Sequence, residues 1–371
     1  MQRMTKQILL LTCLFMLLFS CDKKTSAYQI EGTLSNLEDS TLFAVFTKNE
    51  FKKIDTITCM PDGSFKIETD SLFKNLKILS SNKKRLLNIY LDSTKLITID
   101  GDAKSPELAQ IKGGKINDKL TEFKNINKAL LIERRELHTK LIESKKSNSD
   151  NGEIISKLIN VKHDITSSVL EFLQNNRSEL VSTVLIQRYF TNREDTRKLD
   201  ELLIQLDPSL KETDEVKWLE DFSARVKRTA VGSKAPKFKL KDINNKPINI
   251  ESYKGTTLLL AFAAPWCEVC KTEKQYLKDI RKIYPKKKLK MLVVTLSSDQ
   301  DSIRKIAKKE KLAWDLVADS ANYATDLIDL YEVKTVPSNF VIDSAGVIQL
   351  KSEHLFETKQ LLKKYFADKK K

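Results

Sequence analysis

The chain has few cysteines and few histidines, and this scarcity excludes two common ways of stabilising a fold. It contains 5 cysteines in 371 residues, whereas a secreted protein held together by disulfides has more of them, in an even number. Its three histidines are scattered at His138, His163 and His354, and the sequence has no second Cys-x-x-Cys pair to complete a four-ligand structural zinc site. The stability of so long a chain must therefore come from hydrophobic cores.

The chain also lacks a long hydrophobic run and any motif typical of nucleic-acid binding. The uncharged stretch from Gln7 to Phe19 has an apolar part that is too short for a membrane span of roughly 20 residues. The formal net charge is +15, and the excess is mostly lysine, without a stripe of interleaved aromatic residues. We therefore expect no nucleic-acid partner. The basic surface is either simply solvated or attracted to an anionic membrane or an acidic partner.

The first 20 residues have the pattern of an export signal. Arg3 and Lys6 precede an apolar stretch whose length fits a signal-peptide core of about 7–15 residues. Leu18-Phe19-Ser20-Cys21 follows and resembles the lipobox of bacterial lipoproteins, in which the cysteine is diacylated and becomes the first residue. This resemblance implies a cell-envelope protein anchored to the membrane by lipid on Cys21 and facing the periplasm. The alternative is an ordinary cleaved signal with an incidental Cys21, and in both cases the mature chain leaves the cytoplasm.

The first half of the mature chain carries no cluster of acids, bases or ligands that would indicate catalysis. Residues 21–27 are a polar tether, and residues 28–104 contain short alternating runs separated by turns, which predicts a small β-domain. Pro61-Asp62-Gly63 predicts a hairpin turn. Residues 105–230 have helical periodicity, with two long helices joined by a polar loop at residues 144–152 that predict an antiparallel helical hairpin. Its apolar seam packs either within the chain or against a second copy.

Residues 231–371 alternate strands with helices, which predicts an α/β domain. Expected strands cover residues 257–263, 291–296, 340–343 and 347–350, and expected helices cover residues 270–284, 300–311, 322–331 and 357–368. Such alternation implies parallel strand pairing through crossover helices, and the turn at residues 344–346 implies a closing antiparallel hairpin.

The motif Trp266-Cys267-Glu268-Val269-Cys270 is the strongest chemical signal in the chain. It follows a predicted strand and opens a predicted helix, where unpaired N–H groups and the helix dipole favour the thiolate form of Cys267. Cys270 lies one helical turn further on and can attack a mixed disulfide formed at Cys267. This arrangement predicts a dithiol redox protein, while half of a zinc site and a structural disulfide staple remain alternatives.

Residues 231–371 resemble the extracytoplasmic TlpA/ResA-type thiol-disulfide oxidoreductases, which have a thioredoxin fold and are related to the AhpC/TSA superfamily. Four stretches carry this resemblance: Val231–Phe238, Trp266–Cys270, Thr335-Val336-Pro337 and Phe340–Asp343. The resemblance implies a central mixed sheet flanked by helices. Residues 28–230 loosely resemble the region of unknown function often found ahead of such domains in bacterial lipoproteins.

The resemblance also implies roles for single residues. Val336-Pro337 would carry a cis peptide bond facing the cysteines and, with Trp266, would bind the substrate strand. Glu273 would handle protons for the thiol pair, although it could instead be a surface glutamate. Glu268 would oppose thiolate formation and favour a reducing couple.

The implied activity is reduction or isomerisation of disulfides in envelope proteins, including apocytochromes during cytochrome c maturation. The redox centre would be the Cys267–Cys270 disulfide, with no further cofactor and no metal. The partners would be disulfide-containing client proteins and a membrane thiol donor of the CcdA/DsbD type. A thiol peroxidase is disfavoured because Ala264 and Leu260 stand where peroxiredoxins have threonine and proline. A non-catalytic envelope protein that binds a partner through its N-terminal region is the remaining alternative.

Overall fold

The computed structural model describes residues 28–48, 51–69, 73–92, 94–146, 151–192, 194–297, 299–318 and 323–368. The signal segment, the tether and Cys21 lie outside the described residues. The chain divides into two compact units, residues 1–182 and 183–371, and the predicted boundaries at residues 104 and 230 stay predictions. None of the helices in the described part combines the length and the hydrophobicity needed to cross a bilayer.

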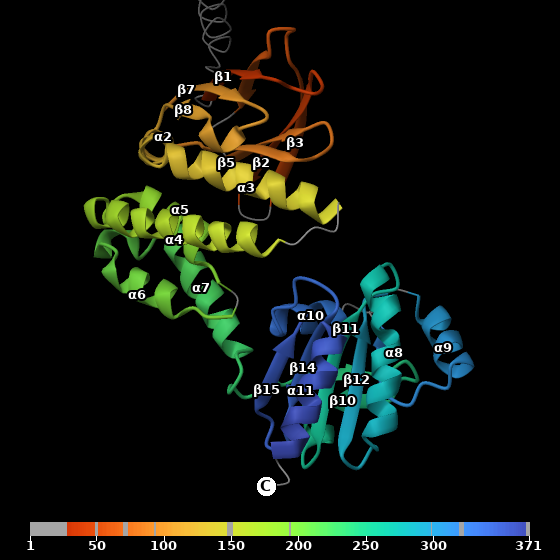
Figure 1. Cartoon of the computed structure of the whole chain (residues 1–371). Helices are drawn as coiled ribbons and strands as arrows, with labels where there is room; N and C mark the ends of the chain where they lie inside the picture. The colour runs from red at the N-terminus through yellow and green to blue at the C-terminus, as the bar shows by residue number, and fades with distance from the viewer. Residues whose placement is uncertain are drawn as a thin grey trace, which may run out of the picture. The chain divides into compact units, whose positions relative to one another are not determined.

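The first unit begins with strands that form two four-stranded sheets (Figure 1). The strands are β1 (Tyr28–Ser35), β2 (Thr41–Lys48), β3 (Phe51–Thr58), β4 (Ser64–Thr69), β5 (Asn75–Ser80), β6 (Arg85–Tyr90), β7 (Leu96–Asp102) and β8 (Gln110–Lys112). One sheet has the order β4-β1-β7-β8, with β1 and β7 parallel, and the other has the order β3-β2-β5-β6 and is antiparallel throughout. Alternate residues of β2 (Leu42, Ala44 and Phe46) enter one common core, so the predicted β-domain is confirmed.

The prediction of a hairpin at Pro61-Asp62-Gly63 is wrong, because the strands on either side of this turn do not pair with each other. β3 pairs with β2, whereas β4 pairs with β1 in the other sheet, so the turn carries the chain from one sheet to the next. Gly63 has φ +81°, and its carbonyl accepts a hydrogen bond from the N–H of Leu34 at 3.0 Å. A Cβ at position 63 would lie 2.2 Å from the Leu34 carbonyl oxygen, so a glycine is required by this close contact with β1.

The helical part of the first unit contains η1 (Pro106–Leu108), α2 (Lys115–Ile126), α3 (Lys128–Lys146) and α4 (Gly152–Asn175). The first of the two long helices predicted from the sequence is interrupted at Asn127, a buried residue whose side-chain amide donates to the carbonyl of Phe123 at 3.0 Å. α3 and α4 pack against each other as the predicted hairpin (Figure 1). Phe123 and Phe172 meet edge to face, so part of the apolar seam packs within the chain.

The second unit contains more helices and then the α/β domain. Helix α5 (Leu180–Phe190) crosses the boundary between the units and is followed by α6 (Arg197–Gln205), η2 (Pro208–Leu210) and α7 (Asp214–Arg228). The strands are β9 (Lys239–Lys241), β10 (Pro247–Asn249), β11 (Thr257–Ala263), β12 (Leu289–Thr295), β13 (Asp315–Ala318), β14 (Ser338–Ile342) and β15 (Ile348–Ser352). The helices between and after them are η3 (Ile250–Tyr253), α8 (Glu268–Ile283), α9 (Gln300–Lys309), α10 (Tyr323–Leu330) and α11 (Leu355–Asp368).

The main sheet of this domain has the order β13-β12-β11-β14-β15. β12 pairs in parallel with both β11 and β13, whereas β14 pairs antiparallel with both β11 and β15. This pairing confirms the predicted mixed sheet and its closing hairpin. Alternate residues of β11 enter two cores on opposite faces, with Leu260 in one and Leu259 in the other. α8 and α11 lie side by side on the second face (Figure 1). The domain is thioredoxin-like, as expected.

Candidate redox site

The Cys-x-x-Cys motif lies where the central strand of the sheet leads into helix α8. β11 ends at Ala263 and the helix begins at Glu268, two residues earlier than predicted. Cys267 is the N-cap residue, and its backbone N–H donates to the carbonyl of Ala264 at 3.2 Å. The buried strand therefore fixes the position of the first cysteine at the N-terminus of the helix.

Cys267 and Cys270 are joined by a disulfide, with the two sulfurs 2.19 Å apart and the Cα atoms 5.2 Å apart. The sulfur of Cys267 accepts a hydrogen bond from the backbone N–H of Cys270 at 3.0 Å. This N–H is one of the groups in the first helical turn without an intrahelical partner, and with the helix dipole it favours negative charge on that sulfur after reduction. Both cysteines are buried, and the partly buried Leu296 and Val336 pack against them.

The segment before β14 brings Val336 and Pro337 to the disulfide. The peptide bond between them is cis, as the resemblance implies. The carbonyl oxygen of Val336 lies 3.5 Å from the sulfur of Cys267. Residues 69 positions apart in the sequence thus form one site.

Two apolar side chains of the motif point outward beside this site. Trp266 is 70% exposed and Val269 is 47% exposed. Large apolar side chains next to a reactive group are available for contact with another chain, because water hydrates them poorly. This exposure fits the expected role of Trp266 in binding a substrate.

Glu273 lies one helical turn after Cys270 and is buried, so the alternative of a surface glutamate is wrong. Its Oε2 accepts the backbone N–H of Leu355, the first residue of α11, at 2.8 Å. Its Oε1 lies 3.3 Å from Nδ1 of His354. His354 is not predicted from the sequence, because a single histidine before a helix gives no signal of a carboxylate from another helix.

Glu268, by contrast, is an exposed residue. Its carboxylate pairs with the ammonium of Lys271 at 2.6 Å on the same helix face. This pairing offsets the negative charge that the sequence analysis expected to act against the thiolate of Cys267, although exposed ion pairs are weak.

Cys59 is the unpaired thiol of the described residues, and it has a different environment. It is buried in the core of the first unit, and burial raises the pKa of its thiol. Within the described part of the chain, no group of three or more histidine, cysteine or acidic residues is placed to hold a metal ion.

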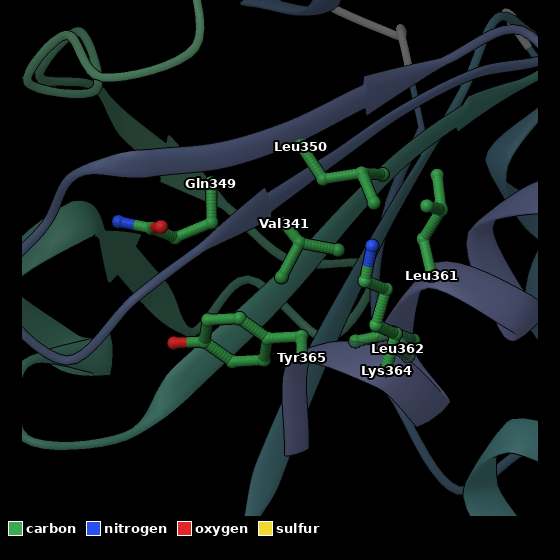
Figure 2. Close-up of a pocket in the computed structure, with 7 residues that line it drawn as sticks. All are labelled: Val341, Gln349, Leu350, Leu361, Leu362, Lys364 and Tyr365. Carbon is green, nitrogen blue, oxygen red and sulfur yellow. The ribbon is translucent and has the colours of Figure 1, made fainter. Parts of the chain in front are cut away.

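An apolar concavity of about 160 Å³ occurs elsewhere on the α/β domain, between the edge of the sheet and α11 (Figure 2). Its lining residues are Val341, Gln349, Leu350, Leu361, Leu362, Lys364 and Tyr365. Neither cysteine lines it, so this concavity is separate from the disulfide site.

Two family models match the chain in separate regions. Residues 231–351 match the AhpC/TSA family, and residues 28–120 match a domain of unknown function, DUF4369. The first match covers the disulfide, Glu273 and the cis proline together. The second covers both sheets of the first unit.

Named relatives match the α/β domain. The thiol-disulfide oxidoreductase ResA of Geobacillus kaustophilus is 30% identical over 120 residues, which are 32% of this chain and 67% of the relative. The thioredoxin-like protein YneN of Bacillus subtilis is 30% identical over 121 residues, 32% of this chain and 68% of the relative. A solved thiol-disulfide oxidoreductase from Bacteroides fragilis is 27% identical, with 35% of this chain covering 99% of that one and a TM-score of 0.31.

Proposed function

Because this chain belongs to the thioredoxin-like thiol-disulfide oxidoreductases of the ResA type, we propose that it reduces or isomerises disulfides of proteins in the cell envelope. One observation carries the proposal. The sulfur of Cys267 lies at the N-terminus of α8, bonded to Cys270 and 3.5 Å from the carbonyl oxygen of Val336. A nucleophile, its resolving partner and a backbone contact for a client are therefore combined in one place.

The reaction begins with the reduced protein. The thiolate of Cys267 attacks one sulfur of the client disulfide, and the other client sulfur leaves with the electron pair and takes a proton from water. The thiol of Cys270 then loses its proton and attacks the sulfur of Cys267. The second client sulfur leaves in the same way. The protein ends as the Cys267–Cys270 disulfide and the client as a dithiol, with two electrons transferred.

Client binding would use the exposed apolar surface and the backbone beside the disulfide. Trp266 supplies an exposed aromatic face, and Val336 offers its backbone carbonyl next to Cys267. An extended client segment can hydrogen-bond to backbone groups of Val336, while Pro337, which has no N–H, fixes the direction of the chain there. Recognition through backbone groups suits an enzyme that acts on several clients.

Glu273 would take the proton that Cys270 loses. It follows Cys270 by three positions on α8, and residues at this spacing have Cβ atoms about 5–6 Å apart. A carboxylate held away from bulk water in this position can accept a proton as the thiol becomes a nucleophile.

The location and partners follow from the sequence rather than from the described residues. The export signal in residues 1–20 and the lipobox-like Cys21 support a lipid-anchored protein facing the periplasm. Each reaction with a client leaves the protein as the Cys267–Cys270 disulfide, so a thiol donor must reduce it again. We propose that this donor is a membrane protein of the CcdA/DsbD type. Apocytochromes with oxidised haem-binding cysteines are candidate clients, as are misoxidised envelope proteins.

Reduction of insulin with dithiothreitol as the final donor tests the activity. We expect wild-type protein to accelerate precipitation of the insulin chains, and Cys267→Ser to lose this activity because the nucleophile is missing. Cys59→Ser, which changes a buried thiol outside the site, is the matched control and should remain active. Equal turnover by wild type and Cys267→Ser would overturn the proposal.

A further inference from the structure

His354 is the residue that connects the buried carboxylate of the redox site with solvent. The side chain of Glu273 is only 11% exposed, whereas the side chain of His354 is 54% exposed. The His354 Nδ1 lies 3.3 Å from Glu273 Oε1. One end of the imidazole therefore contacts the carboxylate, and much of the ring contacts water.

Hydrogen bonds hold the backbone of His354 in place. The His354 N–H donates to Ser352 Oγ at 3.0 Å, and the hydroxyl of Thr358 donates to the His354 carbonyl at 2.9 Å. Both bonds use main-chain atoms of His354, so they survive a change of its side chain. The position is also the residue directly before α11, whose first N–H, from Leu355, binds the same carboxylate.

The two groups that contact the Glu273 carboxylate in the described structure differ in one essential property. The Leu355 N–H cannot exchange a proton with the carboxylate, whereas an imidazole is the side chain whose charge ordinarily changes between pH 5 and 8.

Other charged groups around the pair are each engaged with a partner of their own. Glu357 of α11 accepts a hydrogen bond from the Ser352 hydroxyl at 2.8 Å. Glu353, which precedes α11, accepts a hydrogen bond from the Thr335 hydroxyl at 3.2 Å. Asp279 of α8 pairs with Lys359 at 2.8 Å. Glu357 is linked to the His354 backbone through Ser352, and none of these three carboxylates bonds directly to the Glu273 carboxylate or the His354 ring in the described part of the chain.

Resting on the proposed function, we propose that His354 is a positioning and proton-relay residue through which the proton taken from Cys270 leaves Glu273 for water. The proton passes from the thiol of Cys270 to Glu273, from Glu273 Oε1 to His354 Nδ1, and from the other ring nitrogen to solvent. The electron pair left on the sulfur of Cys270 forms the bond to Cys267, and the client sulfur takes its proton from water. The relay therefore acts on the second thiol step alone.

A two-phase thiol reaction tests this inference. Reduced protein is mixed with 5,5′-dithiobis(2-nitrobenzoate), so that the first coloured thiolate reports attack by Cys267 and the second reports attack by Cys270. In wild type, the second phase should accelerate between pH 5 and 8. In His354→Gln, the second phase should be slower on the order of 10-fold at neutral pH and should lack the rise between pH 5 and 8. This effect is smaller than the 10²–10⁴-fold typical of a general acid or base that transfers the proton in the transition state, because His354 acts through Glu273.

Controls separate a relay from a structural role. The first phase should be unchanged in His354→Gln. His163→Gln is the matched control, since exposed His163 also has its Nδ1 3.3 Å from a carboxylate, that of Asp164 on α4. Glu273→Gln should lose the same pH-dependent rise, and the double variant should be no slower than Glu273→Gln, because both residues act on one route.

Three results would overturn the relay. The first is a second phase in His354→Gln with the pH dependence of wild type. The second is a second phase in His354→Gln that is slowed by the same factor at every pH. The third is a double variant whose second phase is slowed by the product of the factors of the two single variants. Each of these leaves the proposed function standing. A wild-type protein that shows no second phase and does not reduce insulin would instead refute the proposed function, and the relay with it.

Discussion

At the scale of single residues, the environment of each thiol decides its reactivity. Cys267 and Cys59 are similarly buried, at 7% and 5% exposed. The sulfur of Cys267, however, accepts a helix N–H, whereas Cys59 lies in an apolar core where burial raises the pKa of its thiol. Burial alone therefore does not predict which of the two cysteines reacts faster.

This difference predicts selective alkylation. After reduction, iodoacetamide at neutral pH should label Cys267 at least about 10-fold faster than Cys59, because the thiolate is the reacting species. Mass spectrometry of quenched time points gives the two rates, and urea-unfolded protein serves as the control in which the rates should converge. Equal rates in the folded protein would show that the helix N-terminus does not activate Cys267.

The sequence predicts the residues of this site better than it predicts their contacts. The spacing of Cys267 and Cys270 and the motif around Pro337 are local patterns, and the structure brings them together. The contact between Glu273 and His354 joins residues 81 positions apart through the packing of α8 on α11. Nothing in the local sequence of either residue specifies that packing.

At the scale of secondary-structure elements, local patterns fix the elements and longer-range contacts decide their partners. β11 was predicted with the bounds the structure has, because its apolar run is long and continuous. β13, with only four residues, was missed, and β4 was paired with the wrong strand. The partner of β4 was mispredicted because Gly63 contacts Leu34 of β1, and the sequence of the turn does not reveal this long-range contact.

One polar contact between elements gives a prediction with a definite pH dependence. Asp200 of α6 accepts the hydroxyl of Ser223 at 2.6 Å and pairs with Lys227 of α7 at 2.8 Å. Burial alone would raise the pKa of Asp200, but the hydrogen bonds from Lys227 and Ser223 outweigh burial and hold that pKa below its ordinary value. A carboxyl with a lowered folded-state pKa stabilises the fold above its unfolded-state pKa of about 3.9, and this contribution is lost as the pH falls through the folded-state value.

Asp200→Asn should therefore lower the free energy of unfolding by about 1 kcal/mol at neutral pH, and this difference should shrink below about pH 4. Urea unfolding at neutral and acidic pH measures it. Glu201→Gln on the same helix is the control, because Glu201 makes an exposed ion pair with Lys198 and should change stability less. A difference that persists unchanged at acidic pH would show that the carboxylate charge is not what joins the two helices.

At the scale of the whole molecule, the chain consists of two compact units with separate cores, and the two family models match one region in each. The Cys267–Cys270 disulfide lies in the second unit. The length of the chain predicts more than one domain, because a single core rarely serves so many residues. The boundary between the units lies inside a regular helix, α5, where no linker signal exists in the sequence.

Two separate cores predict two unfolding transitions, of which one responds to the redox state. The Cys267–Cys270 bond closes a loop with a sequence separation of 3, and the loop-entropy relation assigns about 2 kcal/mol to so short a cross-link. Reduction should therefore lower the midpoint of one calorimetric transition by about 4–8 °C, the shift expected for a unit of this size, and leave the other in place. The Cys267→Ser/Cys270→Ser variant should not respond to the reductant. A single transition that moves as a whole would show that the two units unfold together, since a redox change confined to one of them would then destabilise both.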